Sequence, residues 1–174
     1  MSDRPAPASG RRASRRVVTI GVYGLTRDGF LEALRRADVG LLMDVRRRRG
    51  VRGAEYAWAN AKRLQAALDE AGIEYRHHLE LAPSAELRKA QFDEDKRGGV
   101  GPRSRRRIAV AYRDGYLAQV LDRVDLGAIV ESMPRDSATA LFCVEAAPEA
   151  CHRALIAERM ASDHGAAVEH LRPA

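Results

Sequence analysis

Short apolar segments rich in β-branched residues alternate along this chain with longer amphipathic segments, and this alternation constrains the fold more than any other feature. The expected strands are 17–23, 39–45, 73–78, 139–145 and 166–171. The expected helices are 28–37, 57–71, 84–96, 105–123, 126–133 and 148–164. Apolar strands joined through helices, with no hairpin signal, are typical of a parallel sheet that is buried on both faces. The sequence therefore predicts an α/β fold with a mostly parallel central sheet and helices on both faces, in a three-layer, Rossmann-like arrangement.

Local signals support several of these elements. Segment 57–71 places small and apolar residues on one helical face, and Gly72 follows as a C-terminal cap. The helix that begins near Pro148 is expected to end at Gly165. Residues 95–104 contain three glycines and a proline, which predicts a loop.

The length of 174 residues predicts one domain with a short extension. Residues 1–15 are rich in Pro, Ala, Ser and Arg without periodicity, so we expect a disordered basic arm followed by a single domain over 16–174. Arginine and serine in such an arm also resemble an organellar transit peptide.

The composition indicates a water-soluble globular protein. Apolar residues make up 45% of the chain and charged residues 31%. No run of 18 apolar residues exists and no secretory signal is evident, so we expect no membrane segment and a cytoplasmic location. In a reducing cytoplasm Cys143 and Cys151 are expected to be free thiols.

Positive charge is concentrated in a few places. The formal charge is +6, and outside the first residues it gathers in Arg46–Arg52 and Arg103–Arg107. These two clusters predict patches that attract anions, with a nucleotide or nucleic acid as the expected partner. The alternative is that they are ordinary solvated faces. Arginine is the usual basic residue of this chain, which has 27 arginines and only three lysines, so a run of arginines does not by itself indicate binding. Oligomeric state is left open.

Residues capable of chemistry follow the expected strands. Ligands of open parallel sheets bind at the carboxyl ends of strands. The residues at these ends are Tyr23, Gly24, Asp44, Arg46, His77, His78, Glu80, Cys143, Glu145, Cys151, His152 and Arg153. We therefore expect one site at this edge of the sheet, although each residue alone is also compatible with an ordinary loop.

The segment from Cys143 to Arg153 is the most informative part of this set. Cys151 is expected in the first turn of a helix, where the dipole favours a thiolate, and Arg153 could bind an anion. Glu145 and Glu149 oppose thiolate formation. His152 could act as a general base.

The same residues allow a second interpretation. Cys143, Cys151 and His152, with His78 or Glu80, are ligands that zinc or iron accepts, although the spacing is not that of a zinc knuckle. A phosphatase loop is disfavoured because Glu149 stands where such a loop, if begun at Cys143, needs arginine. No nucleotide-cofactor motif is present in the sequence, so the cofactor is left undefined.

Several motifs together resemble one family. They are TIGVYG (19–24), LLMDVRRRRGVRGAEYAWAN (41–60), AGIEYRHHLELAP (71–83) and LFCVEAAPEACHRALIAERM (141–160). This combination resembles the domain of unknown function 488 (DUF488) family from Val17 onward. The resemblance implies a compact α/β domain whose core motifs are Asp-Val-Arg and Cys-His-Arg, and it implies no reaction. Many relatives have T-I-G-H-S where this chain has Val22 and Tyr23, so a role of that histidine does not transfer, although Tyr23 offers a hydroxyl.

These observations favour an enzyme that acts on an anionic substrate. The expected catalytic residues are Cys151, His152, Asp44 and Glu145, and the expected substrate-binding residues are Arg46, Arg153, Tyr23 and His78. Cys151 and His152 would supply the nucleophile and proton transfer, and Asp44 would serve as acid, base or orienting group. The alternatives are a non-catalytic nucleic-acid-binding module that uses the arginine patches and a metal-binding protein.

Overall fold

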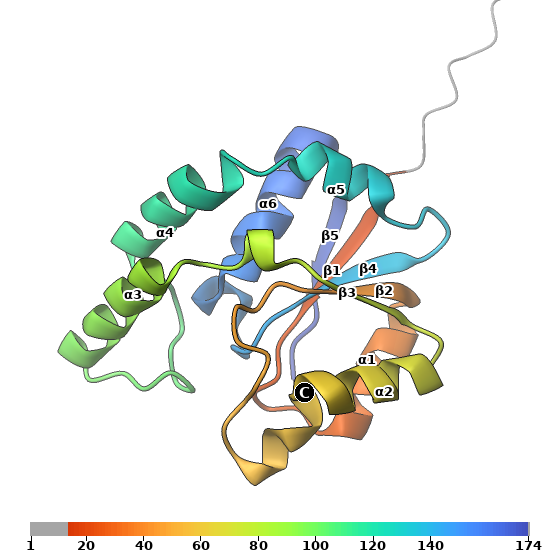
Figure 1. Cartoon of the computed structure of the whole chain (residues 1–174), viewed down its shortest axis with the longest axis horizontal. Coiled ribbons are helices and arrows are strands. Elements are labelled where there is room, and N and C mark those ends of the chain that lie inside the picture. Colours follow the sequence, from red (N-terminus) through yellow and green to blue (C-terminus); the bar gives the residue numbers. More distant parts are fainter. Residues whose placement is uncertain (1–13, 174) are drawn as a thin grey trace, which may run out of the picture.

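The structure, a computed structural model, describes residues 14–173, and a five-stranded parallel sheet lies at its centre (Figure 1). The strands are β1 (Arg16–Ile20), β2 (Val39–Asp44), β3 (Glu74–His77), β4 (Ala138–Phe142) and β5 (Ala167–His170). Their order is β3-β2-β4-β1-β5, and every neighbouring pair is parallel. The predicted α/β class with a parallel sheet is therefore confirmed.

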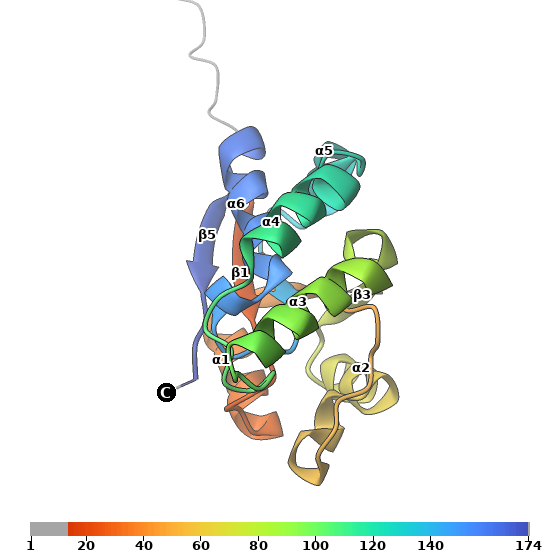
Figure 2. The ribbon, with the colours of Figure 1, turned by 90° about the vertical axis from the view of Figure 1, so that its left-hand side faces the viewer.

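Helices cover both faces of the sheet, as the turned view in Figure 2 also shows. The α-helices are α1 (Arg27–Arg36), α2 (Ala61–Glu70), α3 (Ala85–Arg97), α4 (Val110–Tyr116), α5 (Leu126–Ser132) and α6 (His152–His164). Short 3-10 helices span Ala54–Ala59, Leu79–Leu81 and Pro148–Ala150, and a π-helical turn spans Leu117–Leu121. Buried side chains of α1 and α2 pack on one face of the sheet, and those of α3 to α6 pack on the other. This arrangement is the predicted three-layer one.

Side chains of the central strands alternate between the two cores, because successive residues of a strand point to opposite faces. In β4, Leu141 joins the core under α3 to α6, whereas Ala140 and Phe142 join the core under α1 and α2. A hydrophobic core thus lies on each face of the sheet, and a ligand is expected at the carboxyl ends of the strands.

The expected helix 105–123 is wrong at its start, since α4 begins only at Val110. Tertiary contacts occupy the backbone amides that a helix would use. The Ile108 amide donates to the Glu149 carbonyl (3.1 Å), and the Ala109 amide donates to Gln91 Oε1 (2.8 Å). This segment is therefore a loop that crosses towards the strand ends.

Two other helices also begin later than predicted. The 57–71 segment is divided at Asn60, whose backbone is extended and whose Oδ1 accepts a hydrogen bond from the Val51 amide (2.7 Å). Likewise Cys151 has extended backbone angles and is the N-cap of α6, so it precedes the first helical turn. The caps at Gly72 and Gly165 are confirmed by their positive φ angles.

The first and fourth strands are shorter than expected, and the residues beyond them form loops. β1 ends at Ile20 and β4 ends at Phe142, so Cys143 and Glu145 lie beyond the strand. Cys143 and Glu145 thus lie at the carboxyl edge of the sheet, in the segment that follows β4.

Most of the predicted basic arm, residues 1–13, lies outside the described residues. Arg15, at its end, is part of the folded body: its guanidinium donates to the carbonyls of Val130 and Glu131 (3.0 Å each), at the C-terminal end of α5. Among residues 14–173, no helix has the length and apolarity needed to cross a membrane.

Candidate active site

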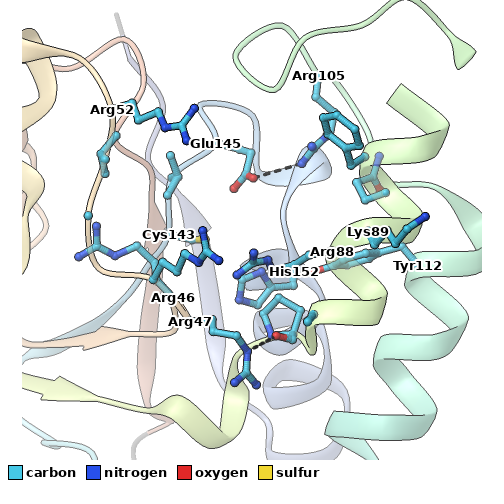
Figure 3. Close-up of a pocket in the computed structure, with 18 of the residues that line it drawn as sticks. Arg46, Arg47, Arg52, Arg88, Lys89, Arg105, Tyr112, Cys143, Glu145 and His152 are labelled. Carbon is cyan, nitrogen blue, oxygen red and sulfur yellow. Dashed lines mark hydrogen bonds and ion pairs between the residues drawn. The ribbon is translucent and has the colours of Figure 1, made fainter. Parts of the chain in front are cut away.

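A pocket of about 560 Å³ opens at the carboxyl edge of the sheet (Figure 3). Its walls come from the loop after β2, from α3, from the loop between α3 and α4, and from the segment that joins β4 to α6. Figure 3 shows Arg46 and Arg52 on one side and Arg88, Lys89 and Arg105 on the other. The parallel topology brings these distant segments together, because every strand ends at this edge.

The charged lining of the pocket is almost entirely basic. It comprises Arg46, Arg47, Arg48, Arg52, Arg88, Lys89 and Arg105, against the single carboxylate of Glu145. Some of these cations are already paired: Lys89 with Asp93 and Arg105 with Asp95. Within residues 14–173, Arg47, Arg48, Arg52 and Arg88 make no ion pair with a carboxylate. The pocket is therefore electropositive.

Arg103 joins the two arginine clusters of the sequence. Its guanidinium donates to the Arg52 carbonyl (3.0 Å) and to Glu55, and it lies over the rings of Tyr23 and Tyr56 at 5.6 and 5.3 Å. The loop after α3 is thereby tied to the loop after β2. Two patches that are about 50 residues apart in sequence border one pocket.

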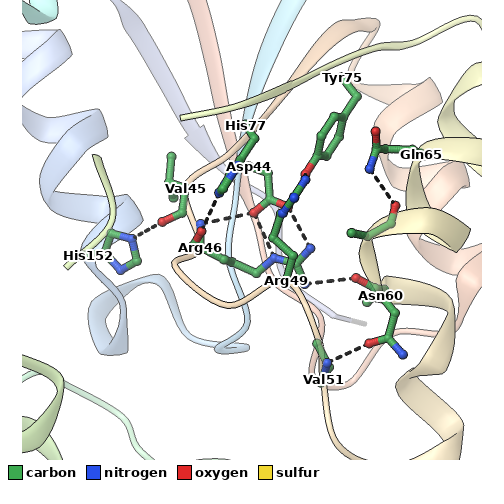
Figure 4. Close-up of polar contacts among 12 residues, drawn as sticks. Asp44, Val45, Arg46, Arg49, Val51, Asn60, Gln65, Tyr75, His77 and His152 are labelled. Carbon is green, nitrogen blue, oxygen red and sulfur yellow. Dashed lines mark hydrogen bonds and ion pairs between the residues drawn. The ribbon is translucent and has the colours of Figure 1, made fainter. Parts of the chain in front are cut away.

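The Asp-Val-Arg motif forms a buried ion pair beneath this pocket (Figure 4). Asp44 accepts hydrogen bonds from Arg46 Nε (2.9 Å), from Arg46 Nη2 (2.7 Å) and from the Tyr75 hydroxyl (2.7 Å). Arg46 Nη1 donates to the Ala59 carbonyl (3.0 Å). Asp44 is fully buried and does not line the pocket, and Arg46 is 2% exposed. This geometry favours the orienting role for Asp44. The guanidinium of Arg46 donates its hydrogen bonds to Asp44 and to the Ala59 carbonyl.

Cys143, Cys151 and His152 form a cluster at the floor of the pocket. Their sulfur and ring nitrogen atoms all lie within 4.8 Å of one another. His152 Nε2 lies 2.9 Å from the Val45 carbonyl oxygen, which requires a proton on Nε2 and directs Nδ1 towards Cys151 Sγ, 3.9 Å away. Cys143 and His152 line the pocket, whereas Cys151 is 2% exposed and lies behind them.

The two thiols have opposite protonation tendencies. Burial raises the pKa of Cys151, but the hydrogen bond from Cys143 and the positive charges of Arg153 and His152 outweigh it and hold that pKa well below its usual range. The hydrogen bond to Cys151, together with burial, raises the pKa of Cys143 well above its usual value. Burial lowers the pKa of His152, and the Cys151 thiolate more than compensates, so the net direction is upward. Of the two thiols, Cys151 is therefore the one whose ionisation is favoured, beside an imidazole whose protonated form is favoured.

Glu145 is a carboxyl group poised to exchange a proton near neutral pH. Burial and the nearby negative charge of Cys151 raise its pKa to about 7. Arg105 Nη1 lies 3.2 Å from Glu145 Oε1, while Oε2 is buried without a hydrogen-bond partner. The described residues thus leave one oxygen of Glu145 without a hydrogen bond.

The loop that carries Glu145 is held from both sides. Arg153 is fully buried and donates to the carbonyls of Glu145 (2.6 Å) and Ala146 (3.2 Å). On the other side Gly21 packs so closely that a Cβ atom there would overlap the Glu145 carbonyl oxygen. Arg153, the arginine of the Cys-His-Arg motif, thus fixes the conformation of the loop that carries Glu145.

Cys143, Cys151 and His152 are also the residues that could hold a metal ion. Two sulfurs and one ring nitrogen are donors that zinc accepts, and the hydrogen bond from His152 Nε2 to Val45 is of the kind that orients a ligating histidine. His78 and Glu80 do not join this cluster, because they pair with each other and do not line the pocket.

The structure brings together most of the residues expected from the sequence. Tyr23, Arg46, Cys143, Glu145 and His152 line one pocket. Asp44, Cys151 and Arg153 lie beneath its surface. The expected substrate-binding residue His78 lies elsewhere.

Sequence reasoning missed the contribution of α3, whose Arg88, Lys89 and Phe92 line the same pocket. The sequence predicts only a helix over 84–96 at this place, with no role for its side chains. No feature of the sequence indicated that this helix lies beside the carboxyl ends of the strands.

Comparison with known proteins identifies a family and little else. A family model described as Domain of unknown function DUF488 matches residues 26–160, which include both core motifs but not the T-I-G segment. No curated protein and no solved structure matches the chain.

Proposed function

Because the chain belongs to the DUF488 family, whose description assigns no reaction, we propose a function from the site itself: an enzyme in which a cysteine thiol attacks an anionic substrate. The observation that carries the proposal is the position of Cys143, Glu145 and His152 on the floor of a pocket whose other charged walls are basic. Nucleophile, proton carrier and anion-binding groups then face the same space.

The substrate class follows from the shape and charge of the pocket. A volume of about 560 Å³ suits a small organic anion. Arg47, Arg48 and Arg88 offer guanidinium groups that bind phosphate oxygens through paired hydrogen bonds. Phe92, 57% exposed on the pocket wall, offers an aromatic face to a nucleobase. A nucleotide, or the end of a nucleic acid, combines these features.

Cys143, and not Cys151, is the sulfur that meets the substrate, since Cys151 lies behind it. As Cys143 Sγ bonds to the electrophilic atom of the substrate, the proton of the Cys143 thiol passes to the Cys151 thiolate. The bond to the leaving group breaks, and protonated Glu145 gives that group its proton. Water then attacks the covalent adduct and gives its proton back to Glu145, while Cys143 leaves as a thiolate and recovers its proton from Cys151.

The buried motif residues position these groups. Asp44 and Arg46 hold the loop after β2, whose Val45 carbonyl accepts a hydrogen bond from His152 Nε2. Arg153 holds the Glu145 loop through two carbonyls. We assign them a geometric role, because Asp44 and Arg153 are fully buried, and Arg46, although it lines the pocket, donates its hydrogen bonds to Asp44 and Ala59.

Protection of Cys143 from alkylation tests the proposal, with inorganic pyrophosphate as the probe. Pyrophosphate is expected to bind the wild-type protein and to slow alkylation of Cys143 by iodoacetamide, measured by peptide mass spectrometry. Arg88→Ala is expected to weaken pyrophosphate binding roughly tenfold or more, since a hydrogen bond to a charged group contributes about 1.5–3 kcal/mol. Arg123→Ala, an exposed arginine away from the pocket, is the matched control and should bind as wild type. Absence of binding, or binding without protection, would overturn the proposal.

A non-catalytic nucleic-acid-binding function is the second candidate, favoured by the contact of Arg103 with the Arg52 carbonyl that unites the two arginine clusters. It predicts that a single-stranded oligonucleotide binds with an affinity that falls steeply with salt. Cys143→Ser should then leave oligonucleotide binding unchanged, whereas an enzyme should lose turnover in this variant.

A further inference from the structure

Two free thiols lie side by side where the pocket meets the core. Cys143 follows β4 and Cys151 is the N-cap of α6, and their sulfur atoms are within 4.8 Å. Both backbones are fixed: the Cys143 amide donates to the Ile20 carbonyl (3.2 Å) and the Cys151 amide to the Pro148 carbonyl (3.0 Å). The pair is therefore held in place by the fold and is not a chance meeting of mobile loops.

The two sulfurs differ in their access to the pocket. Cys143 is 6% exposed and lines the pocket, whereas Cys151 is 2% exposed and does not. A small reagent that enters the pocket meets Cys143 first. Cys151, which does not line the pocket, then has its sulfur within 4.8 Å of the sulfur that has reacted.

We propose that Cys143 and Cys151 are a redox modification site, at which a hydroperoxide such as hydrogen peroxide converts the pair into a reversible disulfide. In the first step Cys143 takes one oxygen from the peroxide and becomes a sulfenic acid, and one water molecule leaves. In the second step Cys151 Sγ attacks the Cys143 sulfur and displaces hydroxide, which takes up a proton and leaves as a second water. Two thiols are oxidised by two electrons and the peroxide is reduced by two.

Oxidation of this pair removes both sulfurs of the proposed active site at once. This consequence rests on the proposed function, since a disulfide contains neither a nucleophile nor a thiolate to accept its proton. The arginine side chains of the pocket do not take part, so anion binding is retained in the oxidised protein. Reduction by a dithiol restores both groups.

The experiment uses the full-length protein, reduced, freed of reductant and treated with hydrogen peroxide. We expect the loss of both titratable thiols, a mass decrease equal to two hydrogen atoms, and full reversal by dithiothreitol. In Cys151→Ser the sulfenic acid on Cys143 should persist and be trapped by dimedone. In Cys143→Ser no disulfide can form within the chain, so the mass decrease of two hydrogen atoms should be absent.

Three results would overturn the proposal: two thiols that stay titratable, oxidation of wild-type Cys143 to sulfinic acid without a disulfide, or purified protein whose thiols are occupied by a stoichiometric metal. Pyrophosphate binding to the oxidised protein tests the proposed function separately from the redox site. A disulfide that forms in protein that never binds pyrophosphate would support the redox site and reject the enzyme.

Discussion

The guanidinium of Arg46 makes two parallel hydrogen bonds, of 2.9 and 2.7 Å, to the carboxylate of Asp44, and both side chains are buried. Removing one partner of a buried pair leaves an uncompensated charge. We expect Asp44→Asn to lower the free energy of unfolding by about 3–5 kcal/mol, measured by urea denaturation. Asp38→Asn breaks the exposed pair with Arg16 and should cost at most about 1 kcal/mol. Equal losses in the two variants would contradict a structural role for the Asp-Val-Arg motif.

Gly21 allows the Glu145 loop to approach the end of β1. Because a methyl group at Gly21 would overlap the Glu145 carbonyl oxygen, Gly21→Ala is expected to destabilise the protein by about 1–3 kcal/mol and to displace this loop. Displacement should appear as a changed rate of Cys143 alkylation. Gly98→Ala is the control, since its Cβ would have no neighbour closer than 3.6 Å, and neither stability nor alkylation should change appreciably.

Stability is expected to depend on pH through Glu145. Its pKa in the folded protein, about 7, is above the ordinary value of 4.5, so the folded state keeps a proton that the unfolded state has already lost. The resulting stabilisation is fully present below pH 4.5 and is lost as the pH rises through about 7, by about 3 kcal/mol.

Glu145→Gln should remove this decrease, as measured by denaturation across the same pH range. Glu149→Gln is the matched control, because the hydrogen bond from Arg172 lowers the pKa of Glu149. If Glu145→Gln retains the wild-type pH dependence, the proton assigned to Glu145 belongs to another group.

The Cys151 thiolate is expected to depend on the proton of Cys143. In Cys143→Ala the hydrogen bond to Cys151 is lost, so the pKa of Cys151 should rise. In Cys143→Ser the hydroxyl can still donate, and the pKa should stay low. Ultraviolet absorbance of the thiolate as a function of pH measures both, and Cys151→Ser should abolish the signal. Identical titrations of the alanine and serine variants would rule out Cys143 as the donor.

The extent to which the site was predictable differs from residue to residue. The strand-end rule correctly places Cys143, Glu145 and His152 at one edge, because parallel strands joined by helices end together. The same rule could not separate residues that face the pocket from those beneath it. Asp44 and Arg153 are chemically capable in sequence, yet their partners, Tyr75 and the Glu145 carbonyl, come from distant segments.

Local sequence determined the alternation of strands and helices, the parallel sheet and the edge at which a site could form, because these follow from apolar periodicity, caps and short connections. Tertiary structure decided which cations remain unpaired, which thiol faces the pocket and where the loop before α4 runs. Each of these depends on contacts between segments far apart in the chain. The amides of Ile108 and Ala109, for example, bind Glu149 and Gln91 in place of helical carbonyls. Such competition between local and distant partners is settled only when the whole chain has folded.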